Sequence, residues 1–426
     1  MVTILLLALG LTSLLLSRKL IGDFFSPPAI FLFFWCVSIG LLFLDIVDYH
    51  PISPTTWYAV SLGMFSFLCG CFFPLAGLVV RPEVLGNRPL FTYFDQKRFE
   101  GSLLVLFGLG ILGFLIQLYH LQTQIGFHNF LTNPQAVREV HSNVKYLGFF
   151  NILNLANFAL GIIYLLVYRK PKRWVLVMLG WAIVTTFLST DRTRFFYAII
   201  WSFYSVAYLP HRLKLRLKTL LAAGGTLLTL GIFFILIAVV YKKQSYEHNQ
   251  IHINLPPAFG FVADPYIYLT GSYPVLDAFL DEKEHEEPLW GKHALEPAVK
   301  VIEAIVPNFQ RAELVSKFYN VPLELNVGTF LQPFFYDFGW IGIAIIPFVL
   351  GWFTSFIYAR MRQRKTPFLV YSAGIFSFCT TISIFVNHYT QVATWFFVIV
   401  GFLHFSYAKT RLEQPDDVYR AWLFPD

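Results

Sequence analysis

Three charged residues that could form an anion site stand close together at Asp191, Arg192 and Arg194. The planar guanidinium of arginine donates hydrogen bonds in pairs and keeps its charge, which suits it to phosphate and diphosphate groups. Further arginines lie in two other polar segments, at Arg138 and Arg311. The sequence therefore predicts a diphosphate site with Arg192 as its first ligand, followed by Arg194, Arg311 and Arg138, and with Asp191 orienting Arg192.

Three side chains could take a proton from a reacting hydroxyl group, and these are Asp337, Asp264 and His388. Asp337 precedes Phe-Gly-Trp at an expected helix start, so it could equally serve as an N-cap. His388 could equally be a hydrogen-bonded histidine at a membrane interface. Tyr336 and Tyr273 belong to an aromatic supply that would suit sugar rings, although aromatic residues of membrane proteins more often form interfacial belts or core.

Acidic residues gather between 281 and 287, where Glu282 and Glu284 could be taken for a metal-binding pair. A solvated loop tip explains this run better, and the chain has no Asp-x-Asp sequence. We therefore expect arginine, rather than a metal, to neutralise a diphosphate, and we expect no cofactor. The usual motifs of ATP-driven transport, dinucleotide redox chemistry and metalloproteolysis are also missing from the sequence.

The elements that must position these residues follow from the composition. Of the 426 residues, 56% are hydrophobic, 19% are aromatic and 13% are charged, whereas a soluble domain carries about 25% charged residues. This is the composition of a polytopic membrane protein. The net charge of +7 fits Lys and Arg gathered in cytoplasmic loops and gives no reason to expect nucleic acid. The four cysteines lie in apolar runs, so we expect buried thiols without disulfides.

Long apolar runs should be helices, because lipid offers the backbone no hydrogen-bond partners. The first run lacks a basic start and a small-residue cleavage site, so we expect a retained helix rather than a signal peptide. The sequence predicts an all-α protein with eleven membrane helices, at about 2–17, 28–47, 56–80, 101–120, 148–168, 174–189, 195–210, 219–240, 338–359, 367–387 and 391–408.

The distribution of Lys and Arg predicts how these helices are oriented. Most of the basic residues fall in alternate loops, which become cytoplasmic if the N-terminus is periplasmic. The C-terminus is then cytoplasmic, and the long polar interval lies outside the cell membrane. The chain divides accordingly into helices 1–8 over 1–240, a large periplasmic loop over 241–337, and helices 9–11 with a cytoplasmic tail over 338–426.

The hairpin that carries the arginine pair is short for two membrane crossings. Two crossings of a hydrocarbon core of roughly 30 Å need about 40 helical residues, which is more than residues 174–209 provide. The hairpin tip should therefore lie slightly below the outer surface. Charges at that depth usually face a protein-lined aqueous cavity and mark function. The alternative is that the arginines reach up to lipid phosphates.

The long polar interval also contains segments that should contact the membrane. Val299, Ile302, Ile305 and Val306 share one face of a predicted helix over 296–306, which could rest on the bilayer interface. The segments 256–264 and 265–273 are apolar and aromatic, too short to span and too apolar for an open loop. We expect them to pack into the mouth of the helix bundle.

Several segments resemble a known family. Residues 187–195, Phe-Leu-Ser-Thr-Asp-Arg-Thr-Arg-Phe, resemble the small-polar-Arg turn of the bacterial oligosaccharide repeat-unit polymerases, the Wzy-type O-antigen polymerases. Residues 326–342 are similar to the stretch that follows the large periplasmic loop of that family. Residues 268–273, Tyr-Leu-Thr-Gly-Ser-Tyr, are similar to a small-residue segment within that loop. The number of helices and the late position of the large loop agree with the same family.

The resemblance implies a GT-C-like glycosyltransferase of the bacterial inner membrane. Its substrates would be glycans linked to undecaprenyl diphosphate, which it would polymerise into O-antigen or a related surface polysaccharide of the lipopolysaccharide kind. The transfer would be inverting and independent of metal. A chain-length regulator and a flippase would be its possible partners in the bilayer.

Two alternatives stay open. The related ligase, which transfers finished glycan to lipid A core, would share the topology and the arginine-rich outside site. A lipid-linked glycan flippase or secondary transporter belongs to a different class, in which inverted repeats and charges near the bilayer midplane are common. The odd number of helices, the lack of a repeat and the position of the charges near the outer surface favour an enzyme.

Overall fold

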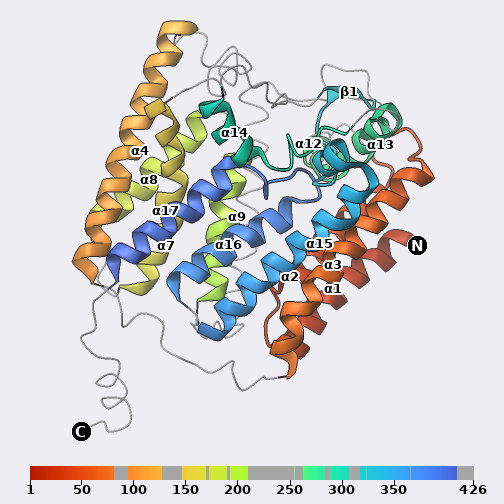
Figure 1. The fold of residues 1–426 in the computed structure, drawn as a ribbon, viewed down its shortest axis with the longest axis horizontal. Helices are drawn as coiled ribbons and strands as arrows, with labels where there is room; N and C mark the ends of the chain where they lie inside the picture. Colours follow the sequence, from red (N-terminus) through yellow and green to blue (C-terminus); the bar gives the residue numbers. More distant parts are fainter. Residues whose placement is uncertain are drawn as a thin grey trace.

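The described part of the chain is almost entirely helical (Figure 1). The computed structural model describes residues 1–80, 95–126, 146–168, 172–189, 192–209, 254, 262–283, 288–306, 317–322, 324–364 and 366–409. The first helices are α1 (Val2–Ile21), α2 (Pro27–Leu42), α3 (Pro54–Val80), α4 (Gln96–Gln124), the 3-10 helix η2 (Tyr146–Ile152), α7 (Leu153–Val167), α8 (Arg173–Leu188) and α9 (Arg192–Tyr208).

The second half of the chain begins with short helices and ends with three long ones. These are α12 (Ala263–Thr270), α13 (Ser272–Lys283), α14 (Glu296–Ile305), α15 (Gln332–Arg364), α16 (Pro367–Ile382) and α17 (Val392–Ala408). Between α14 and α15 the strands β1 (Tyr319–Asn320) and β2 (Glu324–Leu325) pair antiparallel, with Tyr319 opposite Leu325. The short elements gather at one end of the bundle, hereafter the α12–α14 end, at the top of Figure 1.

The helices have the composition and length expected of a membrane protein. Among the described residues, five helices are long and apolar enough to cross a membrane, at Val2–Ile21, Pro54–Gly77, Gln96–Gln124, Gly148–Leu165 and Gln332–Arg364. Four shorter apolar helices cover Pro27–Leu42, Arg173–Thr186, Pro367–Ile382 and Val392–Ala408. The expectation of a helical membrane protein is confirmed at this level. Ten of the eleven predicted segments overlap helices, although α2 ends at Leu42 rather than 47 and α16 at Ile382 rather than 387. The segment 219–240 lies outside the described residues.

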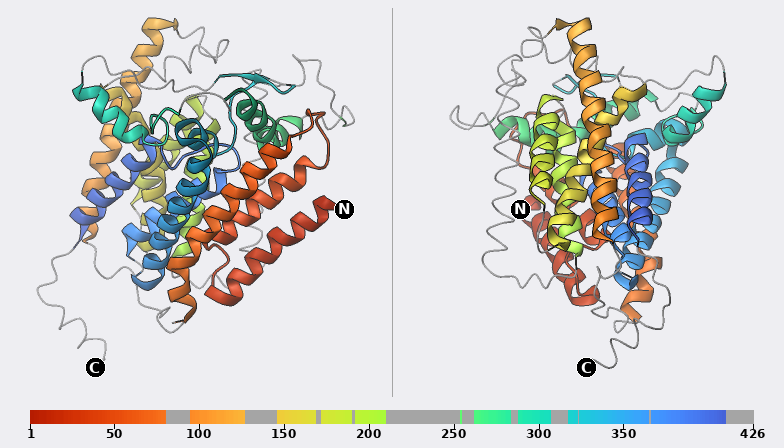
Figure 2. Two further views of the ribbon diagram at one scale, coloured as in Figure 1. Left: turned by 45° about the vertical axis from the view of Figure 1, so that its right-hand side comes forward. Right: turned by 90° about the vertical axis from the view of Figure 1, so that its left-hand side faces the viewer.

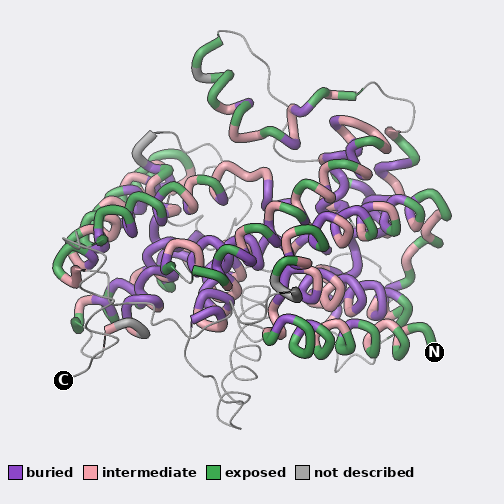
Figure 3. The backbone as a smooth tube through the Cα atoms, turned by 60° about the horizontal axis from the view of Figure 1, so that its bottom comes forward, coloured by how far each residue is buried: buried purple, intermediate pink, exposed green. Residues whose placement is uncertain are grey.

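The surfaces of the bundle are apolar where lipid would touch them. Leu5 and Leu9 of α1 are more than half exposed, as are Phe65 and Phe72 of α3. Figure 3 shows α1, next to the label N, as mostly exposed, while buried residues lie between the helices. Exposed leucine and phenylalanine side chains of this density are unfavourable in water and favourable in a bilayer.

The backbones of α3 and α15 approach closely because a glycine on each helix lies against the backbone of the other. A Cβ atom added at Gly70 would overlap the carbonyl oxygen of Phe348, and one added at Gly351 would overlap that of Phe67. Small residues at such crossings are the usual means by which membrane helices pack. The helices α3 and α15 lie on the right of Figure 1, beside α1 and α2.

The other side of the bundle contains α4, α7, α8, α9 and α17, as the two views of Figure 2 show. Between α4 and α7 lies a buried group of amide side chains: Gln117, Asn151, Asn154 and Asn157. The Asn154 amide donates to the carbonyl of Gly110 at 3.2 Å, and the Asn151 amide donates to Gln117. An added Cβ at Gly110 would come within 2.6 Å of Asn154 Oδ1. The absence of a side chain at Gly110 therefore leaves room for the Asn154 amide group.

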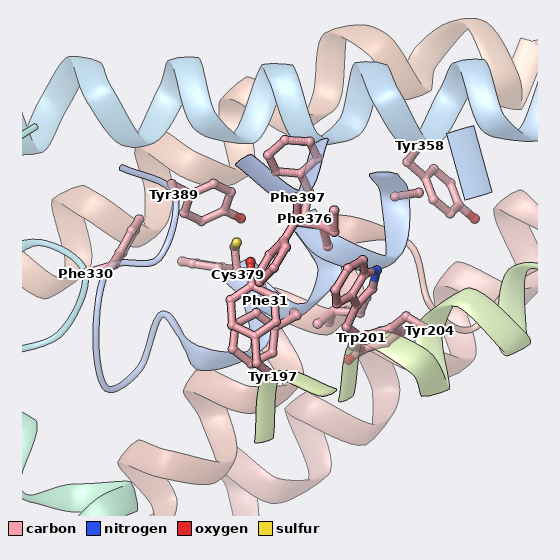
Figure 4. Packing of buried hydrophobic residues seen from close by; sticks show 14 of the residues in the cluster. Phe31, Tyr197, Trp201, Tyr204, Phe330, Tyr358, Phe376, Cys379, Tyr389 and Phe397 are labelled. Carbon is pink, nitrogen blue, oxygen red and sulfur yellow. The ribbon is translucent and has the colours of Figure 1, made fainter. Parts of the chain in front are cut away.

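Aromatic side chains fill the centre, where α9 and α16 meet. The Trp201 indole donates to the Tyr371 carbonyl at 3.1 Å and lies 5.2 Å from the Phe397 ring. Figure 4 shows Tyr197, Trp201 and Phe397 within one packed cluster around Cys379. All four cysteines are free; three are buried, and Cys69 is half-buried.

At the end opposite α12–α14, a polar contact ties the α1–α2 turn to the last turns of α15. The Tyr358 hydroxyl donates to Asp23 Oδ2 at 2.8 Å, and Arg362 Nη1 lies 3.7 Å from the same oxygen. Arg362 Nη2 also donates to the Ile21 carbonyl at 3.1 Å. The Tyr208 hydroxyl of α9 reaches the Phe25 carbonyl at 2.7 Å. Four helices are thereby joined at this end.

Candidate functional site at the α12–α14 end

The candidate site is built around residues 383–391, a buried non-helical segment that joins α16 to α17. The sequence predicts a helix to 387, but α16 ends at Ile382. Ser383, Ile384, His388 and Tyr389 are all at least 95% buried. Non-helical backbone in a membrane protein is tolerated where other protein groups cover it, and such places are often functional.

Hydrogen bonds from three distant parts of the chain hold this segment. The Phe330 backbone amide donates to the Ser383 carbonyl at 2.9 Å, and the Trp35 indole donates to the Ser383 hydroxyl at 2.9 Å. The Ser272 hydroxyl donates to the Ile384 carbonyl at 2.6 Å. The bonds from Phe330 and Ser272 satisfy backbone carbonyls that a continuing helix would have used, so they explain why the helix can stop here.

His388 lies between α9 and the start of α17. Its ring is 5.6 Å from the Tyr197 ring and 5.2 Å from the Phe378 ring. The Thr394 hydroxyl donates to the His388 carbonyl at 2.7 Å and lies 2.9 Å from the Tyr197 hydroxyl. The packed tyrosines that border this region, Tyr197 and Tyr389, are visible in Figure 4.

The predicted arginine pair stands at the start of α9, the helix whose Tyr197 contacts His388. Arg192 is the first residue of α9, and Arg194 is half-buried. Tyr197, which contacts His388, lies one helical turn further along. The N-terminus of a helix carries partial positive charge and favours anions. The predicted ligands Asp191, Arg138 and Arg311 lie outside the described residues.

Asp264 lies on α12, a helix that contacts the same segment. It is buried in the first turn of that helix, and Tyr268, four residues later on the same helical face, stacks on Phe385 at 5.0 Å. Tyr266 fixes α12 to α2, because its hydroxyl donates to the Leu41 carbonyl at 3.1 Å. Burial raises the pKa of Tyr266, so the group stays a neutral donor. This burial agrees with the expectation that 265–273 packs into the mouth of the bundle.

Asp337 has a different position from the one expected of an N-cap. It lies inside α15, which begins at Gln332. Its fully buried carboxylate accepts the backbone amides of His293 at 2.9 Å and Ala294 at 2.5 Å. Asp337 therefore caps the turn that precedes α14 rather than its own helix.

The helix α15 is interrupted directly after Asp337. Gly339 has φ 57° and ψ −144°, a conformation that glycine adopts without strain. The carbonyls of Tyr336 and Asp337 then accept the amides of Leu289 at 3.2 Å and Trp290 at 3.1 Å. Carbonyls released by the break thus hold the chain that leads into α14.

Tyr336 is surrounded by groups that the sequence did not single out. The His293 ring is 4.8 Å away, edge to face, and Lys283 Nζ lies 5.2 Å from the ring centroid. Burial, and then the charge of Lys292, lowers the pKa of His293. The lowered pKa keeps the His293 ring neutral at pH 7, where its two nitrogens can donate and accept hydrogen bonds. Only the folded contact reveals it, since His293 is 43 residues from Tyr336.

The remaining predicted residues have structural partners. Tyr273 is fully buried, with Trp35 and Trp57 at ring distances of 6.0 and 6.2 Å. Glu282 accepts two hydrogen bonds from Lys317 Nζ, both at 2.9 Å, and this contact lowers the pKa of Glu282. Among the described residues, no three His, Cys, Asp or Glu side chains gather as metal ligands would.

Comparisons with family models, with curated proteins and with solved structures find no match to this chain. Function is therefore inferred from the residues of the chain and from their arrangement. Segment 383–391, which carries His388, is contacted by α9 through Tyr197 and by α12 through Tyr268, and these two helices also carry Arg194 and Asp264.

Proposed function

We propose that the chain is a membrane glycosyltransferase that polymerises oligosaccharide repeat units linked to undecaprenyl diphosphate. The observation that carries the proposal is the arrangement around segment 383–391. There, α9, which begins at Arg192, and α12, which carries the buried Asp264, each contact one non-helical segment that contains the buried His388. The resemblance of residues 187–195 and 326–342 to the repeat-unit polymerases supplies the substrate class.

The reaction needs one base and one set of cations. An acceptor hydroxyl attacks the anomeric carbon of the donor glycan from the face opposite the lipid diphosphate. The bond between that carbon and the diphosphate oxygen breaks, and its electron pair leaves with the diphosphate. His388 or Asp264 takes the hydroxyl proton, and Arg192 and Arg194 stabilise the leaving group. We assign Asp337 to positioning, because its carboxylate already accepts backbone amides.

The proposal also includes the number of membrane spans, their arrangement and their orientation in the membrane. These are eleven spans in a GT-C-like arrangement, a periplasmic N-terminus, and the α12–α14 end at the periplasmic face of the inner membrane. The supporting observation is that basic residues such as Lys97 and Arg364 lie at the end opposite α12–α14, as cytoplasmic loops require.

A transporter is the second candidate, and the buried amides between α4 and α7 favour it. Asn154 Oδ1 and both amide atoms of Asn157 have no hydrogen-bond partner among the described residues. Polar groups within membrane helices commonly mark a path for a transported ligand. A ligase of finished glycan would use the same site as the polymerase and would differ only in its acceptor.

The test is the glycan banding pattern of a deletion strain that carries wild-type protein, empty vector, Arg192→Ala or the matched control Arg364→Ala, each with expression checked. We expect the empty vector and Arg192→Ala to lose the long ladder and keep a single-repeat band, while Arg364→Ala keeps the ladder. Loss of all repeat-bearing surface glycan would favour the ligase or the flippase. An unchanged ladder in the deletion strain would exclude a role in glycan polymerisation.

A further inference from the structure

We propose that α14 and the preceding Trp290 dock onto the bilayer, in the headgroup region of the leaflet at the α12–α14 end. The occupant of their exposed apolar face is lipid. The inference is independent of the glycosyltransferase proposal and requires only that α15 crosses the membrane.

The two sides of α14 differ sharply in polarity. Glu296, Lys300 and Glu303 follow one another along one side, and Glu296 pairs with Lys300 at 3.4 Å. The other side exposes large apolar residues: Leu295 56%, Val301 58%, Ile302 41%, Ile305 73% and Val306 44%. Val299, between the two sides, is buried against the protein. A short helix with one charged and one apolar side is the form that lies flat in a membrane interface.

The depth of this helix is set by hydrogen bonds to α15. The Trp290 amide donates to the Asp337 carbonyl at 3.1 Å, so Trp290 sits at the level of residue 337. Ile341, which follows the break at Gly339, begins the exposed apolar row of α15 and is 68% exposed. Trp290 therefore lies close to the start of the lipid-facing surface of α15, where the headgroup region is expected.

Aromatic residues mark the same level. Trp340 and Tyr58 contact each other at 5.4 Å between their rings, and Tyr58 is 62% exposed. Trp290 is 78% exposed, with its ring 6.5 Å from that of Phe338. Tryptophan and tyrosine concentrate at membrane–water interfaces because their rings are partly apolar and partly polar. The three residues form one aromatic level from which α14 starts.

The orientation of α14 is fixed, so its apolar side cannot turn inward. The Asp337 carboxylate binds the amides of His293 and Ala294 just before the helix, and α14 contacts α17. The chain reverses at Trp290 and Gly291, with φ of 52° and 94°. With Val299 against the protein, the side that carries Val301 and Ile305 must face outward. This apolar side and the exposed apolar row of α15 both begin near the aromatic level of Trp290 and Trp340, which is why lipid, rather than water, is its partner.

The test places a spin label at Ile305→Cys on the apolar side or at Lys300→Cys on the charged side. Both variants are full-length and carry Cys69→Ser, which removes the one native thiol that is not buried. Each is reconstituted in vesicles of phosphatidylethanolamine and phosphatidylglycerol. We expect the label at 305 to collide several-fold more with oxygen than with a water-soluble nickel chelate, and the label at 300 to show the reverse.

Two outcomes would overturn the proposal. If both labels collide equally with the nickel chelate, α14 stands in water. If the label at 305 is shielded from both oxygen and nickel and shows dipolar broadening, a second copy of the chain covers this side. Because neither readout depends on glycan synthesis, failure here leaves the polymerase proposal intact.

Discussion

At the scale of single residues, two of the three buried acid–base candidates, Asp337 and His388, differ in what their side chains already contact. The Asp337 carboxylate accepts hydrogen bonds from backbone amides of the turn before α14. The His388 ring, by contrast, packs against the rings of Tyr197 and Phe378. A buried carboxylate bound to two amides is a structural anchor, because each amide would lose its only partner without it.

We predict that Asp337→Asn lowers the melting temperature of the purified protein and that Asp337→Ala lowers it further. Each backbone amide left without a partner costs about 1–3 kcal/mol. Both variants should still produce the glycan ladder at reduced growth temperature. Thermal unfolding in detergent measures the first effect, with the exposed Asp281→Asn as a control that leaves the melting temperature unchanged. An unchanged melting temperature together with complete loss of the ladder would make Asp337 the catalytic base instead.

At the scale of elements, the contact between α3 and α15 depends on two glycines that face the partner backbone. Gly70 lies against Phe348 and Gly351 lies against Phe67. The Ser66 hydroxyl donates to the Ala344 carbonyl across the same contact. The helix α15 also carries Asp337 and the break at Gly339, which hold the turn before α14. The contact between α3 and α15 therefore positions α14 as well as the two helices themselves.

We predict that Gly70→Ala and Gly351→Ala each destabilise the protein by about 1–3 kcal/mol, because the added methyl groups overlap backbone atoms that can move only if the helices separate. Gly77→Ala is the matched control on α3, since nothing lies within 4 Å of an added Cβ there. That control should be neutral or stabilising by up to about 1 kcal/mol, the helix preference of alanine. Equal melting temperatures for all three variants would mean that α3 and α15 do not touch as described.

The helices could be predicted from the sequence because their apolar runs are long and must satisfy their own backbone in lipid. Segment 383–391 could not, since residues 367–386 read as one apolar run. What ends α16 at Ile382 is a set of hydrogen bonds from Phe330, Trp35 and Ser272, which are remote in sequence. Local pattern does not reveal such partners.

The candidate site could likewise be predicted only in part: its residue types could be read from the sequence, but their arrangement could not. The residue types of Arg194, Asp264 and His388 were readable from the sequence, because charge is rare in this chain and therefore conspicuous. Their convergence depends on α12 stacking on Phe385 and on α9 contacting His388. The role of Asp337 was hidden for the same reason, as its amide partners lie more than 40 residues away.

At the scale of the whole molecule, the two ends of the bundle are chemically distinct. One end holds the helix termini with Lys97, Arg98, Arg362 and Arg364, and it is tied together by Asp23. The other end holds α12, α13 and α14 together with segment 383–391. A bilayer between the two ends places the basic termini on one side and the candidate site on the other.

We predict that a membrane-impermeant maleimide labels Lys300→Cys in intact spheroplasts and labels Lys97→Cys only after the membrane is opened. Both variants carry Cys69→Ser, and Lys97 stands at the start of α4, at the basic end. The physical reason is that short basic loops are retained in the cytoplasm during insertion, which leaves the α12–α14 end outside. The site would then face lipid-linked substrates on the outer leaflet. The reverse labelling pattern would put the site in the cytoplasm and remove any role in periplasmic polymerisation, although the packing of the bundle would stay as described.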